Sequence, residues 1–121
     1  MSQVSSQQFF GSVLKAIACT RNHNDDEQAY KHGVIEPAQR IRTMMKEYSE
    51  RPVPQECVHE VLDLLEVIFR TKQVAAHDRS YYLQEILQRN NLTTTFANRV
   101  SATTGELGMP DNPLRIIEVA V

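Results

Sequence analysis

The segment from Gln55 to Thr71 constrains the fold of this 121-residue chain more than any other stretch. At about 100° per residue, its large apolar side chains fall on one continuous arc of a helix: Val58, Val61, Leu62, Leu64, Leu65, Ile68 and Phe69. The opposite arc is polar and mostly acidic, and only Val67 departs from the pattern. An apolar arc this wide is typical of a central helix that packs against several neighbours. The segment therefore predicts an all-α fold built around residues 55–71.

The stretch before this helix predicts two further helices and a short helical turn. Ser5 or Ser6 caps a first helix that reaches about Thr20, with its apolar residues at three- and four-residue spacing. Asp25 or Asp26 starts a helical turn that Gly33 ends. Pro37 fits the first turn of the next helix, because its missing N–H costs nothing there. The triplet Pro52-Val53-Pro54 ends that helix.

The stretch after the central helix predicts two more helices. One covers His77 to Asn90, where Asn90-Asn91 stops it because asparagine tolerates the left-handed backbone. The other covers about residues 92–102, and its three consecutive threonines weaken it. Residues 103–113 contain two glycines and two prolines and predict a loop. The apolar end, residues 114–121, fits a docked strand as well as the start of a helix.

These elements predict one α-helical domain over residues 1–121, a compact bundle of about five helices. Helix starts recur every twenty-odd residues, a spacing shared by bundles and by armadillo- or HEAT-type α-solenoids, so solenoid-like packing is the alternative. Hydrophobic residues make up 41% of the chain and charged residues 23%, which fits a single globular domain. Neither a signal peptide nor a membrane segment is visible.

Charge and cysteine usage favour a cytoplasmic protein that does not bind nucleic acids nonspecifically. The 13 basic and 15 acidic residues give a net charge of −2, whereas nonspecific nucleic-acid binders usually carry a basic excess. Cys19 and Cys57 are far apart and form no metal-binding pair, so both are predicted to be reduced, buried thiols.

Motifs for catalysis or metal binding are weak. Glu56 and His59 form a Glu-x-x-His element, but di-metal bundles need two such elements, and this one projects from the polar arc. His23, Asp25, Asp26 and His32 match no zinc-finger or EF-hand spacing. The chain contains no Gly-x-Ser-x-Gly elbow and no phosphate-binding loop. The sequence therefore predicts no enzyme, no metal site and no cofactor.

A helix-turn-helix over about residues 83–100 is the main alternative function. Leu83 to Leu87 would form its first helix, Asn90-Asn91 the turn, and Leu92 to Val100 the second helix. The polar residues of that second helix could meet phosphates or base edges: Thr93, Thr94, Thr95, Asn98 and Arg99. Against this, the turn lacks the glycine that such motifs favour, and the net charge has the wrong sign.

The favoured prediction is a non-enzymatic protein-interaction module: an adaptor, regulator or inhibitor of another protein. An acidic arc on the central helix could steer a basic partner: it consists of Glu56, Glu60, Asp63 and Glu66. Tyr81, beside Tyr82, is a candidate anchor because aromatic residues concentrate at binding hot spots. The sequence leaves the partner's identity and any self-association open.

Overall fold

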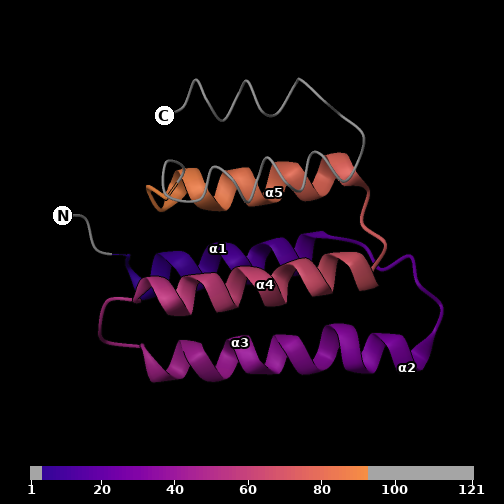
Figure 1. Ribbon diagram of the computed structural model, residues 1–121, viewed down its shortest axis with the longest axis horizontal. Helices are drawn as coiled ribbons and strands as arrows, with labels where there is room; N and C mark the ends of the chain where they lie inside the picture. Colours follow the sequence, from indigo (N-terminus) through magenta and orange to yellow (C-terminus); the bar gives the residue numbers. More distant parts are fainter. Residues whose placement is uncertain (1–3, 93–121) are drawn as a thin grey trace. The chain divides into compact units, whose positions relative to one another are not determined.

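The computed structural model describes residues 4–92 and is drawn as a ribbon in Figure 1. The chain divides into two units, Met1–Val74 and Ala75–Val121, and each is described by itself. The first contains α1 (Ser6–Cys19), α2 (Glu27–Tyr30), the π-helical turn η1 (Lys31–Ile35), α3 (Glu36–Glu47) and α4 (Gln55–Thr71); the second contains α5 (Ala76–Arg89).

The all-α prediction is confirmed, since residues 4–92 contain helices and no strand. An isolated antiparallel bridge joins Val4 to Val53. The helix predicted over 92–102, the loop 103–113 and the apolar end 114–121 fall outside the described residues. The total of about five helices, the solenoid-like packing and the single domain therefore stay predictions.

Helix α1 begins where the sequence predicts. Ser5 caps it, and its hydroxyl accepts a hydrogen bond from the Gln8 N–H at 3.5 Å. Its buried stripe runs through Phe9, Val13 and Ala16, and the next position on that stripe is Thr20, one residue past the helix end. Thr20 is buried, and its hydroxyl donates to the Ala16 carbonyl at 3.0 Å. Cys19 points elsewhere and is exposed, so the prediction that it is buried was wrong.

Helix α4 has the predicted bounds and lies at the centre of the first unit. It packs against α1, α3 and η1, and α3 runs antiparallel to it (Figure 1). Seven of its residues are buried: Cys57, Val58, Val61, Leu62, Leu65, Ile68 and Phe69. Of the predicted apolar arc, only Leu64 is partly exposed. Helix α4 thus contributes more buried hydrophobic residues to the first unit than any other helix, as the hydrophobic effect favours for a helix this apolar on one side.

The stretch from α2 through η1 to α3 is one continuous helix, which differs from the prediction. Asp26 does cap its start, and its carboxylate accepts from the N–H groups of Gln28 and Ala29 at 3.0 and 3.1 Å. Gly33, however, does not end a helix; it lies buried within η1. Pro37 is in the first turn of α3, as predicted.

Pro37 gives a physical reason for the π turn. A proline at this position has no N–H for the Gly33 carbonyl, and in a regular α-helix its ring would collide with that carbonyl. The widened turn avoids this: the Glu36 N–H bonds to the Lys31 carbonyl, five residues back. The helix therefore continues through the proline where the sequence suggested a break.

The C-terminal end of α4 is closed by a Schellman turn. Gln73 has a positive φ of 59°, its N–H bonds to the Arg70 carbonyl at 3.0 Å, and the Val74 N–H bonds to the Phe69 carbonyl at 3.0 Å. The polar loop before α2 is tied to the same end. The His23 N–H donates to the Lys72 carbonyl at 2.8 Å, and the Asn24 side-chain amide donates to the Thr71 carbonyl at 2.9 Å.

Helix α5 ends as predicted, at the two asparagines. Asn91 has a positive φ of 58°, and the Leu92 N–H bonds to the Leu87 carbonyl at 2.7 Å, which makes a second Schellman turn. Leu83, Ile86 and Leu87 are buried. Tyr82 is only partly buried.

Candidate functional site

The acidic face of α4 consists of the four predicted residues Glu56, Glu60, Asp63 and Glu66. The first three are exposed and Glu66 is partly buried. They lie together on α4 because the apolar arc on the other side of the helix faces the core. Val67, the one apolar residue outside that arc, is 45% exposed beside them. The face therefore combines several carboxylates with one exposed aliphatic side chain.

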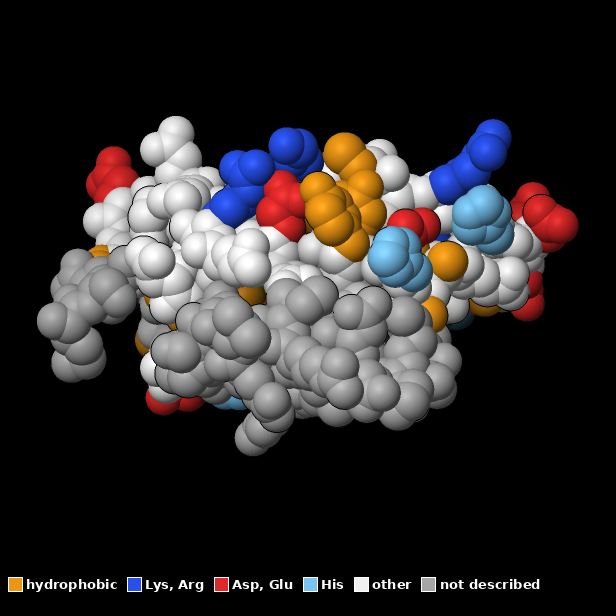
Figure 2. Space-filling view, turned by 90° about the horizontal axis from the view of Figure 1, so that it is seen from above, with side chains coloured by type: hydrophobic (Ala, Val, Ile, Leu, Met, Phe, Trp, Pro, Cys, Tyr) orange, Lys and Arg blue, Asp and Glu red, His pale blue; other side chains and the backbone are white. Residues whose placement is uncertain are grey.

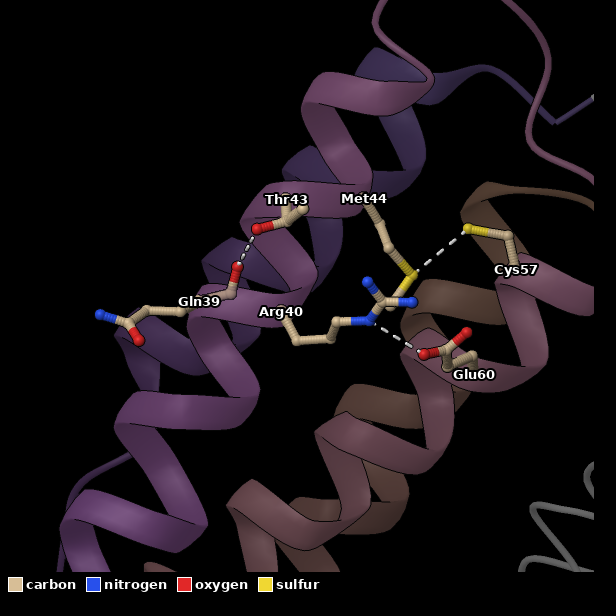
Figure 3. Close-up of polar contacts among 6 residues, drawn as sticks. All are labelled: Gln39, Arg40, Thr43, Met44, Cys57 and Glu60. Carbon is tan, nitrogen blue, oxygen red and sulfur yellow. Dashed lines mark hydrogen bonds and ion pairs between the residues drawn. The ribbon is translucent and has the colours of Figure 1, made fainter.

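One cation from the neighbouring helix reaches this face. The Arg40 Nε of α3 lies 3.1 Å from a Glu60 carboxylate oxygen (Figure 3). The two side chains are 50% and 48% exposed, so water screens the pair and it contributes little to stability. Arg40 is twenty residues away in sequence, and no sequence pattern links it to this face. The antiparallel packing of α3 on α4 creates the contact.

A buried thiol lies next to this ion pair. The Cys57 thiol of α4 lies 3.6 Å from the Met44 thioether sulfur of α3 (Figure 3). Burial raises the pKa of Cys57, and Glu60 and Glu47 add to the effect through their negative charges. Because the thiolate is the nucleophilic form, this cysteine is a poor nucleophile at neutral pH. The predicted burial of Cys57 is confirmed.

The two candidate metal clusters of the sequence do not assemble. Glu56 and His59 are both exposed on α4. In the other cluster Asp26 is occupied as a helix cap, and the His32 Nδ1 lies 3.1 Å from a carboxylate oxygen of Glu36. Among residues 4–92, no group of three or more histidine, cysteine, aspartate or glutamate side chains could hold a metal ion.

A buried lysine is an ionisable group that the sequence patterns did not reveal. Lys72 is 5% exposed at the C-terminal end of α4. Its ammonium donates to the carbonyls of Ile17 and Thr20 at 2.7 and 2.9 Å and lies 3.2 Å from the Thr20 hydroxyl. The burial lowers the pKa of Lys72. A cation at a helix C-terminus stabilises the last carbonyls, and with all three donors in use Lys72 acts as a structural cap of α1.

Tyr81, the predicted anchor, is on α5 in the second unit. It is 56% exposed, and its ring meets the Tyr82 ring edge-on with centroids 5.2 Å apart. A hydrogen bond to Glu85, together with the charge of that carboxylate, raises the pKa of Tyr81. Glu85 also lies 2.9 Å from the Arg89 Nε. Tyr81, Gln84, Glu85, Gln88 and Arg89 line a shallow hollow along α5.

Exposed surfaces of the molecule are chemically mixed. Figure 2 shows a face on which hydrophobic side chains gather between basic and acidic ones, with histidines nearby. A shallow hollow lies at the start of α2. It is lined by Asn22, Asn24, Asp25, Asp26, Glu27, Tyr30 and Ile35. Open hollows of this kind differ from enclosed ligand pockets, which bury most of a ligand's surface.

The candidate DNA-contacting residues Thr93, Thr94, Thr95, Asn98 and Arg99 lie outside the described residues. The structure does describe the first half of the predicted helix-turn-helix. Residues 83–87 are helical, and the backbone turns at Asn91.

None of the helices that the structure describes is both long enough and apolar enough to cross a membrane. Comparisons with protein-family models, with curated proteins and with solved structures each found no match.

Proposed function

We propose that this protein is a non-enzymatic interaction module that binds a partner protein through the acidic face of α4. The observation that supports this proposal is the exposure of Glu56, Glu60 and Asp63 on a helix whose opposite side is buried. A buried apolar arc fixes the helix, so the carboxylates are presented from a rigid support. Rigid presentation lowers the entropy cost of binding.

The chemistry of the face favours a basic partner. Three exposed carboxylates precede the exposed Val67 along α4, and Arg40 of α3 pairs with one of them, Glu60. Opposite charges would steer the encounter and set its register, while Val67 offers apolar area at the C-terminal edge of the face. Such binding weakens as salt rises.

Reversing the charge of the face tests this proposal. The double variant Glu60→Lys/Asp63→Lys should lose partners that the tagged wild-type chain captures from its native lysate. The matched control is Asp25→Lys/Glu27→Lys, which makes the same change in net charge on exposed residues of the same unit and leaves the Asp26 cap intact. Circular dichroism should show that both variants keep their helices.

The two results have opposite meanings. Loss of the same proteins from the α4 variant alone, measured by quantitative mass spectrometry, supports the proposal. Equal capture by the wild type and the α4 variant contradicts it. Equal loss from both variants also contradicts it, because binding would then depend on the net charge of the chain and not on the acidic face of α4.

Binding of DNA through residues 83–100 is the second candidate, and the turn at Asn91 favours it. Fluorescence anisotropy with duplex DNA separates the two functions. A DNA binder should lose affinity steeply as salt rises and should weaken on Arg99→Ala. Affinity that is absent at low salt rules this candidate out.

A further inference from the structure

The π turn η1 places two side chains together that an α-helix would separate. Tyr30 and Ile35 are five residues apart, which corresponds to roughly 140° around a regular α-helix. They nevertheless line the same shallow hollow, and Ile35 is 42% exposed there. A turn closed by a bond between residues five apart returns to its starting side after five residues. The widened turn therefore builds the apolar wall of this hollow.

The same turn sets the position of the polar loop before α2. That loop is anchored to the end of α4 by the His23 N–H and by the Asn24 side-chain amide. It is also linked to α2 by successive turns, since Asn24 accepts from the Asp26 N–H at 2.9 Å and Asp26 caps α2. Rotating α2 against α3 would break these anchors.

Two features hold the widened turn in place. Pro37 cannot donate to the Gly33 carbonyl, so regular α-helical bonding is blocked there. Gly33 itself lies against α4, and a Cβ at this residue would meet the Thr71 side chain, with 2.7 Å to its Cγ2. The glycine permits the close approach, while the proline dictates where the helix slips.

We propose that Pro37 and the π turn form a built-in register device: the helix carries one residue more than regular α-helical bonding accommodates, and Pro37 fixes the excess at residues 31–35. With Pro37 in place, α2, its loop and the hollow keep the observed rotation relative to α3. Without it, the helix slips toward regular bonding and α2 turns by about one residue, or about 100°. This inference does not depend on the proposed partner binding.

Two variants of the full chain test the device by NMR. Pro37→Ala should move Tyr30 away from the hollow that it shares with Ile35, which should change the side-chain chemical shifts of both residues. It should also speed hydrogen exchange at the His23 amide on the order of tenfold, because the anchored loop opens. Combining Pro37→Ala with deletion of His32 should restore both signals, since removing the extra residue makes Tyr30 and Ile35 neighbours one α-helical turn apart. Pro52→Ala, in the exposed loop before α4, is the proline control and should change neither signal.

Two outcomes overturn the proposal. If Pro37→Ala keeps both signals, the close packing of Gly33 against Thr71 of α4 holds the turn without the proline. If deletion of His32 fails to restore them, the turn contains no excess residue. Should Pro37→Ala fail to fold, the deletion variant decides the matter: a folded chain with both signals supports the device, and an unfolded one rejects it.

Discussion

The two ends of α4 are held in different ways. At the C-terminal end, the Schellman turn, the Lys72 ammonium and the Gly33 crossing join α4 to α1, to η1 and to the loop before α2. At the N-terminal end, Pro54 supplies no side-chain cap, and the contacts to α3 include an exposed ion pair and two buried sulfur atoms. One end is fixed by buried polar bonds and close packing, whereas the other leaves its charges in water.

This difference suggests that the C-terminal end of α4 stabilises the fold, whereas its N-terminal end presents charges for binding. Removing one partner of a buried hydrogen bond leaves the other partner unsatisfied, so losing the Lys72 ammonium at the C-terminal end should cost stability. Exposed charges contribute little to folding and can contact a partner. Most of the acidic face belongs to the N-terminal half of α4, and the substitutions below test whether stability and surface chemistry separate in this way.

The largest expected effect is at Gly33, where η1 packs against Thr71 of α4. Gly33→Ala should lower the free energy of unfolding by about 3 kcal/mol, because the new methyl group overlaps the Thr71 side chain. Gly11→Ala is the control: a Cβ added to this residue of α1 would have nothing within 4 Å, so alanine should stabilise the chain by about 0.5–1 kcal/mol. Urea unfolding measures both. Equal effects of the two substitutions would show that the crossing is not tightly packed.

Lys72 should give the next largest effect. Lys72→Met leaves the carbonyls of Ile17 and Thr20 without their donor and should cost about 2 kcal/mol. Lys15→Met, at an exposed position of α1, should cost less than about 0.5 kcal/mol. Unfolding curves for both variants give the comparison. If Lys72→Met is as stable as Lys15→Met, the Lys72 ammonium does not stabilise the fold as a cap of α1.

The cost of Lys72→Met should also depend on pH. Burial lowers the pKa of Lys72 in the folded state below the value of 10.5 for an unperturbed lysine. Between these two pKa values the unfolded chain binds more protons, so the stability contributed by this group rises with pH. The difference in free energy of unfolding between the wild type and Lys72→Met should therefore grow as pH approaches 10.5, as a series of urea titrations would show. A constant or shrinking difference contradicts the sign of the shift.

The two Schellman turns offer a smaller, matched comparison. Gln73 and Asn91 both have left-handed φ values, 59° and 58°, but asparagine adopts this backbone at lower cost than glutamine. Gln73→Gly should raise the free energy of unfolding by about 0.5 kcal/mol, because glycine removes the steric cost of the left-handed conformation. Asn91→Gly should raise it less. Thermal unfolding of both variants measures the difference, and a larger gain at Asn91 would contradict this order.

The sequence predicts elements better than it predicts the contacts between them. The bounds of α4 and the caps at Ser5 and Asp26 follow from local periodicity and side-chain chemistry, and so were predictable. The π turn was not, because Gly33 usually signals a helix end and Pro37 a helix start, and the close approach of Gly33 to Thr71 leaves no pattern in the sequence. Lys72 was hidden for the same reason: a lysine at a helix end is normally solvated, and its acceptors lie 52 to 55 residues away.

For the candidate site, the exposure of the acidic face followed from the same periodicity, whereas the Arg40–Glu60 contact required the antiparallel packing of α3.

The Arg40–Glu60 contact should have the smallest effect on folding. A double-mutant cycle with Arg40→Ala and Glu60→Ala should give a coupling energy of about 0.3 kcal/mol, because both groups are about half exposed. The coupling should fall further in about 1 M salt, where screening reaches within about 3 Å. A coupling above about 1.5 kcal/mol, unchanged by salt, would mean that the N-terminal end of α4 is held as firmly as the C-terminal end. The Glu60 carboxylate would then serve mainly to stabilise the fold, and the proposal that the acidic face binds a partner would lose its support.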